Sequence, residues 1–298
     1  DVVAPAGQFV GEAVTIPALS RVVALACPMG SGKTEAIAAH VAPLLAAGVR
    51  VVLITHRRSL GEALALRLGL PWGDDAAPGS DLRQQGIALC IDSLYPGSRM
   101  RFNPAGWRGA VVVMDEATAV LAHALMGTGT AIADRRVPVL QALGDLLADA
   151  RQVLIADAQL DNATLQAVEA AAGERAYLIG SDHRPAAGRV LIPYAKRGQW
   201  YAELTAQLQR RQRLWVSTTA AERDTPNSAQ NLAVLAASNW PGCRVLVVDR
   251  DTVADPDHDA HRLAADPDGI ASRYDVVIAT PAIAAGLSVS LRGHFAAV

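Results

Sequence analysis

Residues 22–34 read Val-Val-Ala-Leu-Ala-Cys-Pro-Met-Gly-Ser-Gly-Lys-Thr. The first five residues are apolar and favour a buried strand, and the alanine-rich stretch after the glycines has helical spacing. A strand, a glycine-containing loop and a helix in this order are the context that a phosphate-binding loop requires. Gly30 and Gly32 let backbone amides turn toward an anion, and the helix beginning near Lys33 directs its positive end at the same point. This stretch predicts an α/β fold that binds a nucleoside triphosphate.

The residues expected to bind this nucleotide form one continuous segment: Pro28, Met29, Gly30, Ser31, Gly32, Lys33, Thr34 and Glu35. Lys33 is expected to reach the β and γ phosphates, and the Thr34 hydroxyl to ligate magnesium. The chain has 27 basic residues, of which only Lys33 and Lys196 are lysines, so a lysine here indicates a site that suits a compact ammonium group. Cys27 stands where the strict motif has glycine, and a tight loop without a phosphate remains the alternative reading.

An acidic pair follows a second apolar run. Residues 111–118 read Val-Val-Val-Met-Asp-Glu-Ala-Thr, which places Asp115 and Glu116 at the end of a predicted strand. Triphosphate hydrolysis needs a carboxylate for magnesium and a group that orients the attacking water. We assign the first role to Asp115 and the second to Glu116, and we interpret both, with Lys33, as catalytic residues. The alternative for the pair is ordinary helix capping.

Apolar runs and helical segments alternate along the chain, which predicts parallel sheets covered on both faces. Strands are expected at 22–26, 49–55, 87–91, 110–114, 153–156, 189–192, 214–217, 245–248 and 276–279. Helices are expected at 35–47, 59–68, 137–150, 163–172, 200–209 and 231–239. Residues 249–268 carry seven aspartates and two prolines and are expected to form a solvated loop. We place a first domain at 1–182, a linker at 183–190 and a second domain at 191–298.

The composition of the chain excludes several classes of protein. The formal net charge is −2, which does not fit a protein that holds DNA by bulk electrostatics. The three cysteines are far apart, so a disulfide framework or a zinc site is not expected. No long uncharged apolar stretch and no signal peptide is apparent, and we therefore expect a cytoplasmic protein with no membrane partner.

The chain resembles superfamily 2 helicases of the DEAD-like kind, with Asp-Glu-Ala-Thr at 115–118. Within that group it looks most like replication-origin-binding helicases and related plasmid or phage replication proteins. The segments that carry the resemblance are 28–34, 55–60, 90–94, 157–160, 279–281 and 286–288. The resemblance implies an α/β fold of two RecA-like P-loop domains, with ATP and Mg²⁺ in the cleft and a single strand of nucleic acid across both.

The predicted contacts with nucleic acid lie at the ends of predicted strands, where hydroxyl, guanidinium and amide groups suit sugar and phosphate. They are Thr55, His56, Arg57, Arg58, Asp92, Ser93, Ser217, Thr218, Thr280 and Gly286. A basic helix start, helix caps and simple turns are the respective alternatives. Asp157 and Gln159 stand where the family often has Ser-Ala-Thr, which links hydrolysis to domain movement. Asp-Ala-Gln departs from that triplet, and we predict the coupling role for these two residues.

These observations predict an ATP-dependent helicase or translocase that acts on single-stranded nucleic acid, DNA rather than RNA, in plasmid, phage or mobile-element replication. Replication proteins are then candidate partners. The resemblance also implies a Gln- and Arg-rich helix beyond residue 298 that carries an arginine finger. We therefore expect an incomplete second domain and weak hydrolysis by this piece alone. A P-loop ATPase or kinase that ignores nucleic acid and a non-catalytic nucleotide-binding module remain as alternatives.

Overall fold

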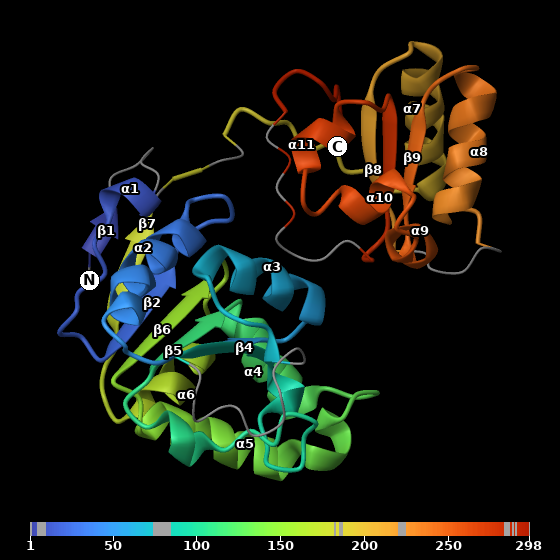
Figure 1. The fold of residues 1–298 in the computed structure, drawn as a ribbon. Helices are drawn as coiled ribbons and strands as arrows, with labels where there is room; N and C mark the ends of the chain where they lie inside the picture. The colour runs from blue at the N-terminus through green and yellow to red at the C-terminus, as the bar shows by residue number, and fades with distance from the viewer. Residues whose placement is uncertain are drawn as a thin grey trace. The chain divides into compact units, whose positions relative to one another are not determined.

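The computed structural model describes residues 2–4, 10–73, 85–181, 183–184, 187–219, 225–282, 287, 289 and 291–297. The chain divides into two compact units, Asp1–Gly188 and Arg189–Val298. Both units contain a parallel sheet with helices packed on it, so the predicted α/β class is confirmed (Figure 1). No helix within the described ranges is long and apolar enough to cross a membrane.

The first unit contains a seven-stranded parallel sheet with the order β1-β7-β2-β6-β5-β3-β4. In that order the strands are Val2–Ala4, Tyr177–Ser181, Val22–Ala26, Gln152–Asp157, Val111–Asp115, Val51–Thr55 and Gly86–Cys90. The central strands β2, β3, β5 and β6 are almost continuously buried. Runs of valine, leucine and isoleucine form such strands because both faces of a parallel sheet are covered by helices.

Helices cover both faces of this sheet (Figure 1). They are α1 (Val10–Ala13), α2 (Lys33–Ala46), α3 (Arg58–Leu68), α4 (Ala117–Met126), α5 (Ile132–Ala148) and α6 (Asn162–Ala172), with 3₁₀ turns at Ile91–Ser93 and Pro104–Trp107. The main core lies between the sheet and α4 to α6, where Trp107, Phe102 and Met114 are fully buried. This packing fixes the carboxyl ends of β2, β5 and β6 as one rigid edge.

The second unit has a three-stranded parallel sheet with the order β8-β10-β9, formed by Leu214–Ser217, Val276–Ala279 and Val245–Val248. Two separate apolar clusters pack on it. One contains residues of α7 (Arg197–Gln209) and α8 (Ala229–Asn239). The other contains residues of α10 (Asp259–Arg262) and α11 (Pro267–Ala271), with the short helix α9 (Arg250–Ala254) beside them. Ala297 forms a parallel bridge with Leu214, so the end of the described chain adds to the β8 edge.

Two predictions of secondary structure are wrong. Residues 189–192 are not a strand, although their composition is strand-like, and Val190 and Leu191 are 83% and 90% exposed. Residues 249–268 form three short helices instead of a loop, because Asp249, His258 and Asp266 each accept a hydrogen bond from the first turn that follows them. The aspartates in that segment therefore include helix caps.

Candidate active site

The predicted catalytic residues come from two strands that flank a third. In the sheet register Ala26 pairs with Asp157, and Asp115 pairs with Ala156. The carboxyl ends of β2, β6 and β5 therefore lie side by side, with the loop of residues 27–32 after β2 and Asp115 at the end of β5. The fold brings Lys33, Asp115 and Asp157 to one edge of the sheet, where open parallel sheets bind their ligands.

The loop between β2 and α2 has the backbone of a phosphate cradle. Gly30 and Gly32 have φ angles of 71° and 90°, which side-chain-bearing residues rarely adopt. Gly32 is the N-cap of α2, and no side chain caps that helix start. The free amides of the first turn are therefore open to an anion. The Ser31 hydroxyl is fully buried and has no hydrogen-bond partner within the described structure, which leaves one more donor in the loop.

The N-terminal segment buttresses this loop from outside the sheet. The backbone N–H of Val10, at the start of α1, donates to the carbonyl oxygen of Ser31 at 2.7 Å. Val10 itself is fully buried. The loop therefore has a main-chain contact with the start of α1.

Lys33 is held over the loop. Its Nζ donates to the carbonyl oxygens of Cys27 and Pro28 at 2.7 and 3.0 Å. Partial burial lowers the pKa of Lys33, while Asp115 is the carboxylate that most strongly raises it. The ammonium group and the Asp115 carboxylate are therefore neighbours, as a site for a triphosphate and its cation requires.

The Asp115 carboxyl group is crowded by burial and by other acids. Its pKa is raised to about 6, chiefly by burial and also by Glu116 and Asp157, against the lowering effect of Lys33. A divalent cation would stabilise the ionised form of such a carboxylate, because it neutralises the negative charge. Within the described chain no cluster of three or more acidic, histidine or cysteine side chains is arranged to hold a metal. A magnesium ion would therefore take Asp115 and the Thr34 hydroxyl, and fill its other positions with phosphate oxygens and water.

Glu116 has a strained backbone and a histidine neighbour. Its φ and ψ angles are both 51°, a left-handed conformation, and its side chain does not cap α4. His56 Nε2 lies 3.8 Å from Glu116 Oε2. Burial, and then Asp157, raise the pKa of Glu116, while Arg57 and Lys33 lower it. The sequence predicts His56 as a nucleic-acid contact alone, and it contains no signal for the approach of His56 to Glu116.

Asp157 connects the end of β6 to the start of α4. Its carboxylate accepts a hydrogen bond from the Thr118 backbone N–H at 2.9 Å and from the Gln159 backbone N–H at 2.8 Å. Asp157 is 7% exposed, and both hydrogen bonds are partly buried. The contact of Gln159 with Asp157 uses its main chain, and its side chain is exposed. Asp157 thus caps the start of α4, which Glu116 does not.

The outer residues of the nucleotide-binding segment differ in their surroundings. Met29 is 67% exposed. Glu35, in the first turn of α2, forms an ion pair with Arg67 of α3. This ion pair links α2 to α3. The groups of this segment that remain as candidates for binding phosphate are Lys33, Thr34 and the loop amides.

The predicted nucleic-acid residues after β3 have unequal access to a ligand. Thr55 is fully buried, and its hydroxyl donates to the Arg57 carbonyl oxygen at 3.1 Å. The His56 side chain is 11% exposed, and burial, followed by Arg57 and His123, lowers its pKa. Arg57 and Arg58 are exposed, and Arg58 pairs with Glu62 at 2.7 Å. Arg57 therefore presents the most accessible cation of this group.

The side chain of Asp92 is used inside the protein. Its carboxylate lies 2.8 Å from His123 Nε2 and accepts hydrogen bonds from the Thr130 hydroxyl at 2.6 Å and the Ile132 N–H at 3.2 Å. Asp92 therefore joins the turn after β4 to α4 and to the start of α5. Ser93, next to it, ends the same 3₁₀ turn.

In the second unit the predicted hydroxyls lie at the carboxyl ends of β8 and β10. Ser217 is exposed, whereas the Thr218 hydroxyl donates to the Asn227 carbonyl oxygen at 2.7 Å. The Thr280 hydroxyl donates to the Val248 carbonyl oxygen at 3.1 Å and accepts from the Ala282 N–H. Gly286 lies outside the described residues. The structure thus brings Ser217, Thr218 and Thr280 to one edge of the second sheet.

No protein-family model matches the chain. An uncharacterized protein of Picosynechococcus sp. (strain PCC 7002) is 28% identical over 294 residues, which cover 95% of this chain and 29% of that protein. Two crystal structures of the DUF1998 helicase MrfA, one bound to DNA and one to DNA and AMPPNP, match with TM-scores of 0.55 and 0.56. Identity to them is 12% and 13%, and each match covers 87% of this chain.

The chain spans less than a third of the curated relative and about two fifths of MrfA. At this level of identity the MrfA structures establish the fold alone. The two-unit α/β fold, with a parallel sheet in each unit, is similar to that of the matched part of MrfA.

Proposed function

We propose that this chain is the ATP-binding motor portion of a nucleic-acid helicase or translocase. The observation that supports it most is the convergence of Lys33, Asp115 and Glu116 at one sheet edge, from two strands that flank β6. A phosphate cradle, an ammonium group and a buried carboxylate in this arrangement are the groups that phosphoryl transfer uses. The bound DNA in the MrfA structures supports nucleic acid as the second ligand.

In the proposed mechanism the residues of the chain position the reactants. The amides of the loop at 28–34 and the Lys33 ammonium hold the phosphates in line, and Thr34 with Asp115 holds the cation. Magnesium, when bound, would neutralise charge that develops on the phosphate oxygens. Glu116 orients a water molecule, and His56 lies beside the Glu116 carboxylate. Since burial raises the pKa of Glu116, this carboxylate is a better proton acceptor than an exposed one.

Asp157 is the proposed coupling residue. Its carboxylate contacts both the turn after β6 and the first turn of α4, which follows Glu116 directly. A shift of Glu116 and the start of α4 would therefore reach Asp157 through its hydrogen bond with Thr118, and Gln159 through its hydrogen bond with Asp157. Gln159, whose side chain is exposed, is proposed to transmit that shift to bound nucleic acid.

We further propose that the nucleic acid is a single strand of DNA and that the whole protein acts in replication of a plasmid, phage or mobile element. The order of sequence motifs supports this proposal. MrfA is described as a DUF1998 helicase, and the match to it adds no support for a replication-origin-binding subtype.

The test is ATP binding and hydrolysis with and without single-stranded DNA, with Lys33→Ala as the inactive control. Stimulation of hydrolysis by DNA supports the motor. Hydrolysis that ignores DNA would instead favour a P-loop ATPase or kinase, and ATP binding with no turnover in the full-length protein would favour a regulatory module. Failure of the chain to bind ATP would overturn the proposal.

A further inference from the structure

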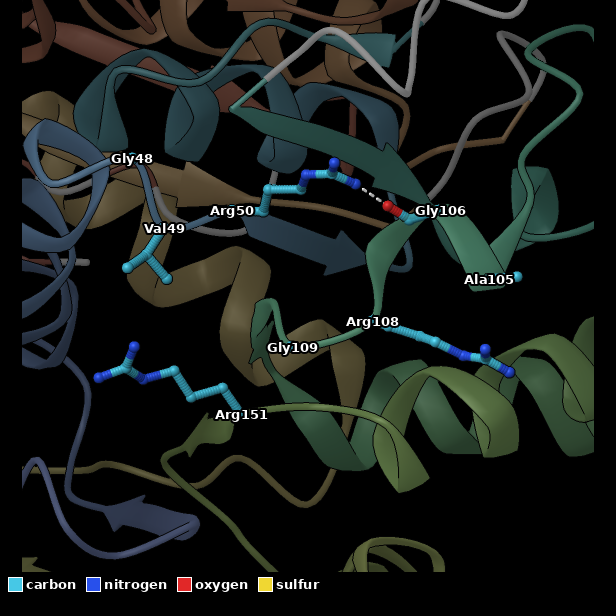
Figure 2. A pocket seen from close by; sticks show the side chains of 8 residues that line it. All are labelled: Gly48, Val49, Arg50, Ala105, Gly106, Arg108, Gly109 and Arg151. Carbon is cyan, nitrogen blue, oxygen red and sulfur yellow. Dashed lines mark hydrogen bonds between the residues drawn. The ribbon is translucent and has the colours of Figure 1, made fainter.

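A hollow of about 490 Å³ opens at the amino-terminal edge of the first sheet, the edge opposite to Lys33 and Asp115 (Figure 2). Residues 48–50, 105–106, 108–109 and 151 line it. These residues lie in the connections that lead into β3, β5 and β6. Three of the lining residues are arginines and none is acidic. The hollow therefore has an excess of positive charge.

The three arginines differ in how they are engaged. Arg108 donates to Asp149 Oδ2 at 2.9 Å, so its charge is matched. Arg50 donates to the Gly106 carbonyl oxygen and lies 5.9 Å from the centre of the Trp107 ring, neither of which is an anion. Arg151 is exposed, and its side chain forms no hydrogen bond or ion pair with any residue that the structure describes. Figure 2 shows its side chain extending away from that of Arg108. Two guanidinium groups at this edge thus lack a carboxylate among the described residues.

In the second sheet an aspartate neutralises a corresponding pair of arginines. Val276 of β10 pairs with Leu214 on one side and Val245 on the other, which places Asp275 between Arg213 and Arg244. The Asp275 carboxylate accepts from Arg213 Nε at 3.4 Å and from Arg244 Nε at 3.3 Å. Burial alone would raise the pKa of Asp275, but the hydrogen bonds from Arg244 and Arg213 hold it below its ordinary value.

The first sheet repeats this backbone register without the acid. Val111 of β5 pairs with Val51 and with Gln152, which places Ala110 between Arg50 and Arg151. The Val111 N–H donates to the Arg50 carbonyl oxygen at 2.8 Å, just as the Val276 N–H donates to that of Arg244 at 3.1 Å. Ala110 therefore occupies the backbone position of Asp275, and its buried methyl group supplies no charge.

We propose that this hollow binds a phosphate-bearing anion, whose charge neutralises Arg50 and Arg151 as the Asp275 carboxylate neutralises Arg213 and Arg244 in the second sheet. Guanidinium groups bind phosphate through paired N–H donors, and arginine is better suited to this than lysine. The hollow has room for more than a single carboxylate, so pyrophosphate or the phosphates of a nucleotide fit its size. This site is separate from the phosphate loop, because it lies at the other end of the same strands.

The test is calorimetric titration of pyrophosphate into the chain in a Lys33→Ala background, which weakens the phosphate loop as a competing site. We expect saturable binding that Arg151→Gln weakens at least tenfold. Arg175→Gln is the matched control, because Arg175 is an exposed arginine of the same unit, 94% exposed at its side chain, and lies outside the hollow. An absence of binding, or equal affinities of the Arg151 and Arg175 variants, would overturn the proposal.

A second pair of variants tests the comparison between the sheets. Ala110→Asp supplies an internal carboxylate and is expected to abolish pyrophosphate binding, whereas Ala110→Asn, of the same size but uncharged, retains it. Equal binding by these two variants, when circular dichroism shows both folded, would contradict the inference. If neither Ala110 variant folds, the comparison of the Arg151→Gln and Arg175→Gln variants decides the question.

The phosphate source is identified by repeating the Arg151→Gln measurement with a short single-stranded oligonucleotide. A loss with pyrophosphate alone identifies a free polyphosphate, and a loss with both ligands identifies the phosphates of a nucleic-acid backbone. Loss with neither ligand overturns the site.

Discussion

The Asp157 carboxylate accepts the backbone N–H of Thr118 at 2.9 Å, so the end of β6 holds the first turn of α4 directly after the Asp115-Glu116 pair. In the sequence these residues are 39 positions apart. The hydrogen bond fixes the direction in which α4 leaves the sheet, and with it the left-handed backbone of Glu116. Positioning of the acidic pair therefore depends on a residue that belongs to a different strand.

Asp157→Ala is expected to lower the free energy of unfolding by about 1–2 kcal/mol, because it leaves the partly buried N–H groups of Thr118 and Gln159 without their acceptor. It should also reduce ATP hydrolysis by more than it reduces ATP binding. Chemical denaturation and steady-state kinetics measure the two effects. Asp161→Ala is the matched control, since Asp161 caps α6 from an exposed position and should affect stability less and hydrolysis not at all. Unchanged stability of the Asp157 variant would contradict this account.

The pKa of Asp115 predicts how stability depends on pH. Its value of about 6 exceeds the ordinary 3.8, so the native state binds more protons than the unfolded state between these limits. The free energy of unfolding should therefore fall as the pH rises from about 4 to about 6. Asp115→Asn should remove this dependence and be more stable than the wild type at pH 8 by roughly 1–3 kcal/mol.

The same substitution should abolish the effect of Mg²⁺ on ATP binding, because the cation loses its carboxylate ligand. Denaturation at several pH values, with and without Mg²⁺, checks both statements. Thr164→Ser, a conservative change in a buried residue remote from Asp115, is the control. A variant with the pH profile of the wild type would show that Asp115 does not carry this titration.

The sequence predicted the central strands well, because a strand buried on both faces needs an unbroken apolar run, as β2, β3, β5 and β6 have. It missed β7, whose residues are mostly half-buried, and β1, which has three residues. Residues 189–192 have the composition of a strand, yet composition carries no information on whether a partner strand is available. The acidic segment at 249–268 was misread for a related reason: aspartate favours loops and helix caps alike.

In the site, the sequence predicted which groups meet, because the strand-loop-helix motif and the acidic pair have fixed places in a parallel sheet. It did not predict which polar side chains are already engaged. Asp92 follows a strand as a ligand-binding residue would, but it is engaged by His123 of α4, by Ile132 of α5 and by Thr130 between these helices, which lie up to 40 residues away in the sequence. Such contacts depend on tertiary packing and leave no local pattern.

The left-handed backbone of Glu116 predicts an unusual response to glycine. A residue with a Cβ pays about 1 kcal/mol or more in this conformation, and glycine does not. Glu116→Gly is therefore expected to be more stable than Glu116→Ala by about 1 kcal/mol, although both lose the carboxylate and should lose ATP hydrolysis. Thermal and chemical denaturation of the two variants give the difference. If the alanine variant were equally stable or more stable, the strain would not exist in solution.

Arg57 offers a direct test of the nucleic-acid surface. It is exposed and stands before α3 without capping that helix by its side chain, so Arg57→Ala should leave the free energy of unfolding unchanged. If Arg57 contacts one phosphate of a single strand, its loss should weaken DNA binding about threefold to tenfold and reduce the slope of log affinity against log salt by about 0.7. Fluorescence anisotropy at several salt concentrations measures both. Arg175→Ala removes an equal charge from the same unit, so a matching loss in that control would mean that only net charge matters.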